Sequence, residues 1–243
     1  MRYAIFGDIH SNLVAFKAVL QDLEKKGGFD RIWCLGDVVG YGPEPHACIE
    51  LLQQYNHVCI AGNHDLAAIG CIDTLDFNED AALATKWTAQ QLTEEDKDYL
   101  KFLPLILTED SFSLAHGSPR EPIWEYLLST RAAQDNLEFF NTPFCLVGHS
   151  HVPLVFEYSD NSVNLSQLRD ETTIKLGANR LIVNPGSVGQ PRDNDPRSSY
   201  ALYDSETDII YHHRVEYNIE ATQKKMQQKK LPEFLVYRLS CGM

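Results

Sequence analysis

The first third of the chain alternates short apolar runs with amphipathic segments, and this alternation constrains the fold most strongly. Residues 3–6, 32–35 and 58–61 are apolar runs of strand length, whereas residues 12–26 and 46–55 carry apolar side chains at helical spacing. Such a series predicts a parallel sheet with helices on its faces, and ligands bind beyond the carboxyl ends of such strands. The polar loops that follow the three strands should therefore lie side by side.

The remainder of the chain predicts more strands and a helical insertion. A length of 243 residues fits one large α/β domain, so we expect residues 1–243 to form a single domain with an insertion at residues 71–103. The insertion has the pattern of two amphipathic helices, which could form a lid or an oligomer contact. Strands should resume at residues 105–107, 112–115, 144–147 and through most of 154–211, with a helix near 131–140 and a solvated surface helix without a partner at 221–230.

Composition narrows the classes of function. The chain has 34 acidic and 21 basic residues, a net charge of −13. This charge repels nucleic-acid backbones, so a polymer ligand is disfavoured, but a small phosphorylated substrate is not. No apolar stretch approaches 18 residues, and the six cysteines include no CxxC pair. We therefore expect a cytoplasmic protein with reduced thiols and no membrane partner.

Every polar loop after a predicted strand contains a residue type that binds metals. Carboxylate, amide oxygen and imidazole together favour Mn, Fe, Zn, Co or Ni over the oxygen-only sites of Ca. Seven such side chains exceed what one tetrahedral ion needs. Two ions that share one carboxylate would use them all, in an arrangement that suits in-line phosphoryl displacement. The candidate ligands are Asp8, His10, Asp37, Asn63, His116, His149 and His151.

The ordered motifs GDIHSN, GDVVG, GNHD, HGS and GHSH resemble those of the calcineurin-like metallophosphoesterases. The segment NPGSVGQPRD at 184–193 is similar to the form in small bacterial and archaeal members. The resemblance implies an α/β fold, a four-layer α/β/β/α sandwich of two mixed sheets flanked by helices, with a dinuclear centre at the strand ends. It implies that Asp8, His10 and His151 bind the first metal, that Asn63, His116 and His149 bind the second, and that Asp37 bridges. Ser11 stands where many members have glycine.

The implied activity is hydrolysis of a small phosphodiester or phosphomonoester by a hydroxide held between the two ions, of which manganese is the favoured element. The catalytic histidine of the family corresponds to His64, which would protonate the leaving group, while Asp65 or a backbone carbonyl orients its ring. Arg192, Arg120 and Tyr41 are candidate substrate-binding residues. Arg192 could instead pair at the surface with Asp193 or Asp195, and Tyr41 could be a packing residue.

Other functions share the same core. A protein phosphatase and a dinucleoside polyphosphate hydrolase are alternatives, because surrounding loops set substrate choice. A nuclease is disfavoured by the net charge and by the lack of a basic stretch beside the motifs. A non-catalytic interaction module, resembling the retromer subunit of this fold, is a further alternative, but the ligand set here is complete and favours an enzyme. A homo-oligomer formed through the insertion is compatible with every one of these functions.

Overall fold

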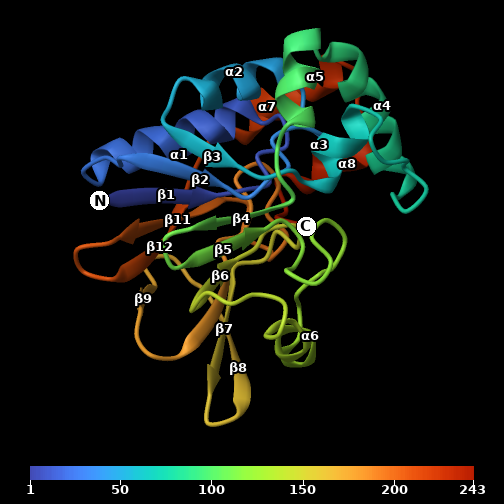
Figure 1. The fold of residues 1–243 in the computed structure, drawn as a ribbon. Helices are drawn as coiled ribbons and strands as arrows, with labels where there is room; N and C mark the ends of the chain where they lie inside the picture. The colour runs from blue at the N-terminus through green and yellow to red at the C-terminus, as the bar shows by residue number, and fades with distance from the viewer.

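Two six-stranded mixed sheets form the framework of the computed structural model, which describes residues 1–243 (Figure 1). The first sheet has the order β3-β2-β1-β11-β12-β9 and the second the order β4-β5-β6-β10-β7-β8. Strands of the first sheet are β1 (Arg2–Phe6), β2 (Arg31–Cys34), β3 (His57–Cys59), β9 (Thr173–Lys175), β11 (Ser198–Asp204) and β12 (Ile209–Val215). Those of the second are β4 (Ile106–Glu109), β5 (Phe112–Ala115), β6 (Phe144–Leu146), β7 (Leu154–Ser159), β8 (Ser162–Gln167) and β10 (Arg180–Asn184).

One hydrophobic core lies between the two sheets and a larger one lies between the first sheet and its helices, and alternate residues of the strands supply the two. In β1, Tyr3 and Ile5 pack into the inter-sheet core, whereas Ala4 and Phe6 pack into a second core beneath helices. Side chains alternate across a strand, so a strand covered on both faces is apolar throughout. This explains why residues 3–6 form an uninterrupted apolar run.

Helices cover the outer faces of both sheets. Along the first sheet lie α1 (Leu13–Lys25) and α2 (Pro45–Gln53), with α7 (Ile219–Gln228) packed beside α1 (Figure 1). Along the second lies α6 (Thr130–Asn136), which contacts β7 and β8. Asn12 caps α1 by accepting a hydrogen bond from the Ala15 N–H, as expected for a helix that begins after a polar loop. The expected α/β/β/α layering is confirmed.

The parallel arrangement predicted for the first three strands is also confirmed. β1 pairs in parallel with β2, and β2 with β3. In the second sheet, β5 and β6 are parallel neighbours, and so are β6 and β10. The carboxyl ends of parallel strands meet at one edge of a sheet, so the loops after β1, β2 and β3 lie together, as do those after β5 and β6.

Helices from three parts of the chain gather at one end of the molecule. They are α3 (Asn63–Ala68), α4 (Glu79–Gln91), α5 (Glu94–Lys101) and α8 (Glu233–Arg238) (Figure 1). Thus residues 71–103 contain the two expected helices, and Thr93 and Asp96 form the reciprocal cap at the start of α5. Whether the segment is a lid or an oligomer contact stays a prediction. The longest helices have 13 residues, and none is long and apolar enough to cross a bilayer.

The helix expected at residues 221–230 is present at the surface as α7, but it is not solvated on every side. It buries Thr222 and Met226. Met226 joins Leu235 of α8, Ala84 of α4 and Tyr41 in one apolar cluster. The apolar stripe of α7 is narrow and surrounded by Lys and Gln, so the sequence pattern concealed it. These helices therefore close the end of the molecule at which the polar loops meet.

Candidate metal centre

The seven predicted ligands, which we call the ligand cluster, come together at the meeting point of the polar loops. Each follows a strand: Asp8 and His10 follow β1, Asp37 follows β2, Asn63 follows β3, His116 follows β5, and His149 and His151 follow β6. Every member is at most 4% exposed. Donor atoms lie within 4.8 Å of one another in two groups that share Asp37, namely Asp8, His10, Asp37 and His151, and Asp37, His116 and His149.

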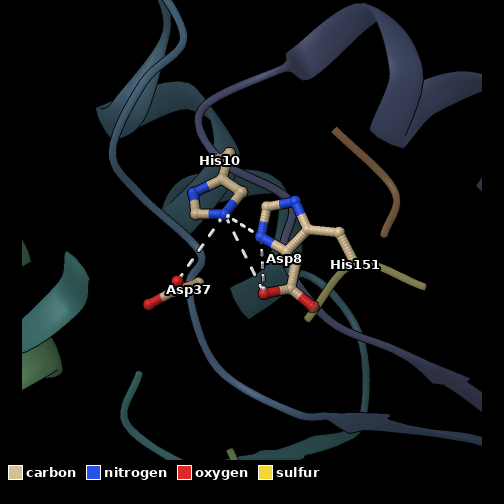
Figure 2. Close-up of side chains that lie close together, drawn as sticks. All are labelled: Asp8, His10, Asp37 and His151. Carbon is tan, nitrogen blue, oxygen red and sulfur yellow. Dashed lines mark hydrogen bonds and ion pairs between the residues drawn. The ribbon is translucent and has the colours of Figure 1, made fainter. Parts of the chain in front are cut away.

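Figure 2 shows the first group, in which four side chains point toward one another. His10 Nε2 lies 3.6 Å from Asp37 Oδ2 and 3.9 Å from Asp8 Oδ1. His151 Nε2 lies 3.3 Å from the same Asp8 oxygen and 3.0 Å from His10 Nε2. Two imidazole nitrogens and two carboxylates therefore surround one point.

The hydrogen bonds of the two rings determine which nitrogen faces that point. His10 Nδ1 lies 3.1 Å from the Val39 carbonyl oxygen, and His151 Nδ1 lies 2.6 Å from that of Gln190. A carbonyl oxygen can only accept, so both Nδ1 atoms carry the hydrogen and both neutral rings present an Nε2 lone pair. Two lone pairs at 3.0 Å repel each other unless a cation lies beside them. This geometry fits a bound metal ion.

The second group is built in the same way around His116. Its Nδ1 donates to the Leu35 carbonyl oxygen at 2.8 Å, while its Nε2 lies 3.2 Å from Asn63 Oδ1 and 3.3 Å from Asp37 Oδ2. Asp37 Oδ2 is buried and accepts no hydrogen bond. A buried carboxylate oxygen without a hydrogen bond is costly, and positive charge beside it, from a protonated His116 or from a bound cation, would compensate it. The donor set thus fits two divalent cations that share Asp37.

His149 completes the second group through its other nitrogen. Its Nε2 donates to the Trp124 carbonyl oxygen at 3.2 Å, which leaves Nδ1 as the free donor atom. The ring also stacks on Tyr126, with centroids 4.0 Å apart and planes inclined by 21°. The loop that carries Trp124 and Tyr126 therefore holds this ring in position.

Burial makes most of these imidazoles neutral, which is the form that binds metals. It lowers the pKa of His149 to about 3, and it holds the pKa of His10 and His151 well below the usual value. Burial opposes protonation of His116 too, but the adjacent Asp37 carboxylate outweighs it and raises the pKa of His116 to about 10. The Asp37 carboxylate thus stabilises positive charge beside it, on His116 or on a bound cation.

The loops hold their ligands in strained backbone conformations. Asp8, His10, Asp37, His149 and His151 all have positive φ, between 48° and 63°. This left-handed region costs on the order of 1 kcal/mol for each residue other than glycine, and such strain clusters at functional sites. Backbone packing is close as well, because a Cβ on the glycine before Asn63 would overlap Asp37 Oδ1.

His64 lies beside the ligand cluster and belongs to neither group. Its backbone N–H donates to Asp37 Oδ1 at 2.9 Å, and its ring packs 4.3 Å from Tyr41 and 4.6 Å from Phe77. Burial lowers the pKa of His64 to about 4. The protonated ring expected from the sequence is therefore disfavoured until negative charge enters the site.

Asp65 has a different position from the one expected. One carboxylate oxygen accepts from the Gly62 N–H at 3.0 Å and the other from the Val39 N–H at 3.1 Å. Both oxygens thus tie the loops after β2 and β3 together, and the ring nitrogen of His64 faces Thr85 Oγ1 at 3.5 Å instead. Asp65 belongs to the scaffold of the loops and does not orient the His64 ring.

A cavity of about 100 Å³ adjoins the ligand cluster, and two of the three candidate substrate-binding residues line it. Tyr41 and Arg192 line it, and Arg192 donates to Tyr41 Oη at 3.3 Å and to Gln190 Oε1 at 3.1 Å. The alternative surface pairs are absent, because Asp193 pairs with Arg214 and Asp195 with Arg197. Arg120 is outside the cavity, 39% exposed and paired with Glu125.

Several other residues that line the cavity were not predicted from the sequence. Five of them are half-buried or exposed and therefore lie toward the opening of the cavity: Phe77, Trp124 and Tyr126, which we call the aromatic mouth, and Asp76 and Asn78. The only signal for Trp124 and Tyr126 was their place in an aromatic stretch soon after the HGS motif. Residues 76–78 lie in the insertion that was expected to form a lid, a specificity element or an oligomer contact, but no pattern distinguished these three residues within it.

Comparison with known proteins agrees with this architecture. Residues 1–208 match the family model described as the calcineurin-like phosphoesterase superfamily domain. A metallophosphoesterase structure from Sphaerobacter thermophilus has a TM-score of 0.91 and 45% identity, covering 100% of this chain and 99% of that one. An uncharacterised protein of Methanocaldococcus jannaschii is 39% identical over 98% of this chain and 97% of its own length.

A more distant similarity is confined to part of the chain. The symmetrical bis(5'-nucleosyl)-tetraphosphatase of Pseudomonas putida is 38% identical over 66 residues, which are 26% of this chain and 23% of that protein. Such a short match carries no substrate assignment. The full-length matches and the family model show that this chain belongs to the calcineurin-like phosphoesterase superfamily.

Proposed function

We propose that the protein is a metal-dependent phosphoesterase that hydrolyses a small phosphomonoester or phosphodiester with two divalent transition-metal ions. The observation that carries this proposal is the pair of donor groups that share Asp37, buried at the edge where parallel strands end. Manganese is the ion we expect, with iron, zinc, nickel and cobalt as alternatives that the same oxygen and nitrogen donors accept.

The division of ligands follows the two groups. Asp8, His10 and His151 would hold one ion, Asn63, His116 and His149 would hold the other, and Asp37 would contact both. When bound, such a pair of cations supplies a nucleophile from water near neutral pH and neutralises charge on phosphate oxygens. The backbone carbonyls behind the four imidazoles keep each ring in the tautomer and orientation that ligation requires.

His64 is the residue we assign to the leaving group. It lines the cavity without belonging to a donor group, so its ring can hydrogen-bond to a substrate oxygen. An approaching phosphate brings negative charge, which raises the pKa of His64 from about 4 and favours the proton that the departing oxygen needs. Arg192, held by Tyr41 and Gln190, would donate to a phosphate oxygen.

Metal analysis combined with a substrate panel tests this function. The purified protein is assayed with added Mn²⁺ on phosphomonoesters, phosphodiesters, cyclic nucleotides, dinucleoside polyphosphates, a phosphopeptide and single-stranded DNA. We expect two ions per chain and turnover of small monoesters or diesters. Two bound ions without any hydrolysis would favour the interaction module, and a preference for the phosphopeptide or the DNA would favour a protein phosphatase or a nuclease.

A further inference from the structure

The size of the cavity limits which part of a substrate it can enclose. A volume of about 100 Å³ accommodates a phosphoryl group, whereas sites that enclose whole drug-sized ligands measure about 300–1,000 Å³. The alcohol part of a phosphate ester must therefore extend out of the cavity. The residues at its opening decide which alcohol is accepted.

The aromatic mouth lies where the leaving group would emerge. The ring of Phe77 is 4.6 Å from that of His64, which we assign to the departing oxygen, and 5.6 Å from that of Trp124 at 80°. Phe77 comes from the loop before α4 and Trp124 from the loop after β5, so the two loops meet across the opening. An alcohol leaving beside His64 therefore contacts aromatic rings.

The polar groups at the opening are an acceptor and a donor, with no second cation. Asp76 forms no hydrogen bond or ion pair within the chain and lines the cavity. Asn78 uses its Oδ1 to accept from the Ala81 N–H, which leaves its amide N–H groups to donate. Arg192 is the only Lys or Arg among the lining residues. A second phosphate group at the opening would face the exposed Asp76 carboxylate, and the like charges would repel each other.

We propose that the aromatic mouth binds the planar ring of a substrate's alcohol part, so that the preferred substrates are monophosphate esters of nucleosides or of aromatic alcohols. Alkyl phosphates and dinucleoside polyphosphates are disfavoured, the first because they have no ring to stack and the second because of the charge at Asp76. This inference rests on the proposed function, since it concerns the leaving group of the same reaction.

Differential losses in kcat/KM test the proposal. Phe77→Ala and Trp124→Ala are assayed with Mn²⁺ on adenosine 5'-monophosphate, 4-nitrophenyl phosphate and glycerol 3-phosphate. Each variant is compared with the parent on the same substrate, so intrinsic reactivity cancels. Loss of one stacked ring should lower kcat/KM for the ring-bearing esters about 10-fold more than for glycerol 3-phosphate, mainly through KM. Of adenosine 5'-monophosphate and 4-nitrophenyl phosphate, the ester with the larger loss in kcat/KM indicates whether the mouth binds a nucleoside or an aryl group.

Two controls separate recognition from folding. Phe77→Leu keeps the apolar packing against the cluster of α4 and α8 but lacks a flat face, so it should fold and show the same differential loss. Phe102→Ala removes an 81% exposed ring outside the cavity and should leave all three values unchanged. Equal losses on all three substrates in the Phe77 variants would overturn the proposal while the phosphoesterase function stands.

Binding provides a readout that does not depend on turnover. In the His64→Ala background, which slows hydrolysis, calorimetry compares adenosine 5'-monophosphate with glycerol 3-phosphate. We expect about 10-fold tighter binding of the nucleotide, and loss of that difference when Phe77→Ala is added. Equal affinities would contradict the aromatic mouth, and a higher kcat/KM of the parent on diadenosine tetraphosphate than on the monophosphate would contradict the single-phosphate preference. Absence of turnover on every ester would instead count against the proposed function.

Discussion

The ligand cluster and the aromatic mouth are neighbours, yet the chain holds them in different ways. Members of the cluster are buried, follow strand ends directly and have their rings anchored on backbone carbonyls. The mouth is half-buried or exposed and comes from two loops far from each other in sequence. The sheet edge therefore positions the groups for chemistry, whereas the loops of the mouth, which can vary without disturbing that edge, are the elements to which we assign substrate choice.

Removal of the carboxylate that both donor groups share should abolish metal binding as well as turnover. Asp37→Asn keeps the shape of the side chain but removes the charge that both donor groups share. We expect loss of bound metal and a fall in turnover of more than about 100-fold, since changes to residues that merely orient ligands already cost 10–100-fold. Metal content and kcat measure the effect. Asp76→Asn, the same change at the mouth, should retain two ions per chain, and full metal content in Asp37→Asn would contradict the shared-ligand assignment.

His64 stands between the two regions, so its removal should separate binding of metal from turnover. His64→Ala should leave metal content intact and lower kcat by about 10²–10⁴-fold on esters with poor leaving groups, with a smaller loss on 4-nitrophenyl phosphate. His46→Ala, which alters a 53% exposed ring on α2, is the matched control and should change neither quantity. Parallel loss of metal would identify His64 as a ligand.

The loop after β5 connects the regions, and Glu125 stabilises it. Its carboxylate accepts from Ser118 Oγ at 2.5 Å, from Asn136 Nδ2 at 2.9 Å and from Arg120. We expect Glu125→Gln to loosen the neighbouring Trp124 carbonyl and to weaken binding of one of the two ions by about 10-fold. Metal titration measures this, with Glu121→Gln in the same loop as control. If the affinities of both metal ions were unchanged in Glu125→Gln, the loop would contribute to the aromatic mouth and not to metal binding.

The smallest effects should distinguish the two candidate arginines. Arg192→Lys keeps the charge but loses the fork that can contact Tyr41, Gln190 and a phosphate together, so KM should rise about 10-fold. Arg120→Ala removes an exposed partner of Glu125, and we expect less than a 3-fold change. Steady-state kinetics on one ester measure both. A larger KM effect at Arg120 than at Arg192 would reverse the assignment.

The difference between cluster and mouth also explains which features the sequence revealed. Strands at residues 3–6, 32–35 and 112–115 were predictable because apolar runs of that length need burial on both faces. The ligands were predictable because one or two metal-binding residues follow each predicted strand that ends in a motif loop. Phe77 and Trp124 lie in loops without periodicity, and Met226 lies in a helix dominated by Lys and Gln, so no local pattern distinguished them.

Local patterns were enough to predict the parallel β1-β2-β3 unit, the helices beside it and the residue types at the strand ends, because periodic burial is encoded in neighbouring positions, whereas the second sheet and the four layers followed only from the family resemblance. The partners of those residues depend on the packed fold. Asp65 joins the loops after β2 and β3 by hydrogen bonds instead of orienting the His64 ring. Arg192 lines the cavity, whereas Arg120 does not. Hydrogen bonds and charge pairs depend on how the two sheets and the closing helices pack, and that packing joins positions more than one hundred residues apart, such as His10 with His151 and Tyr41 with Arg192.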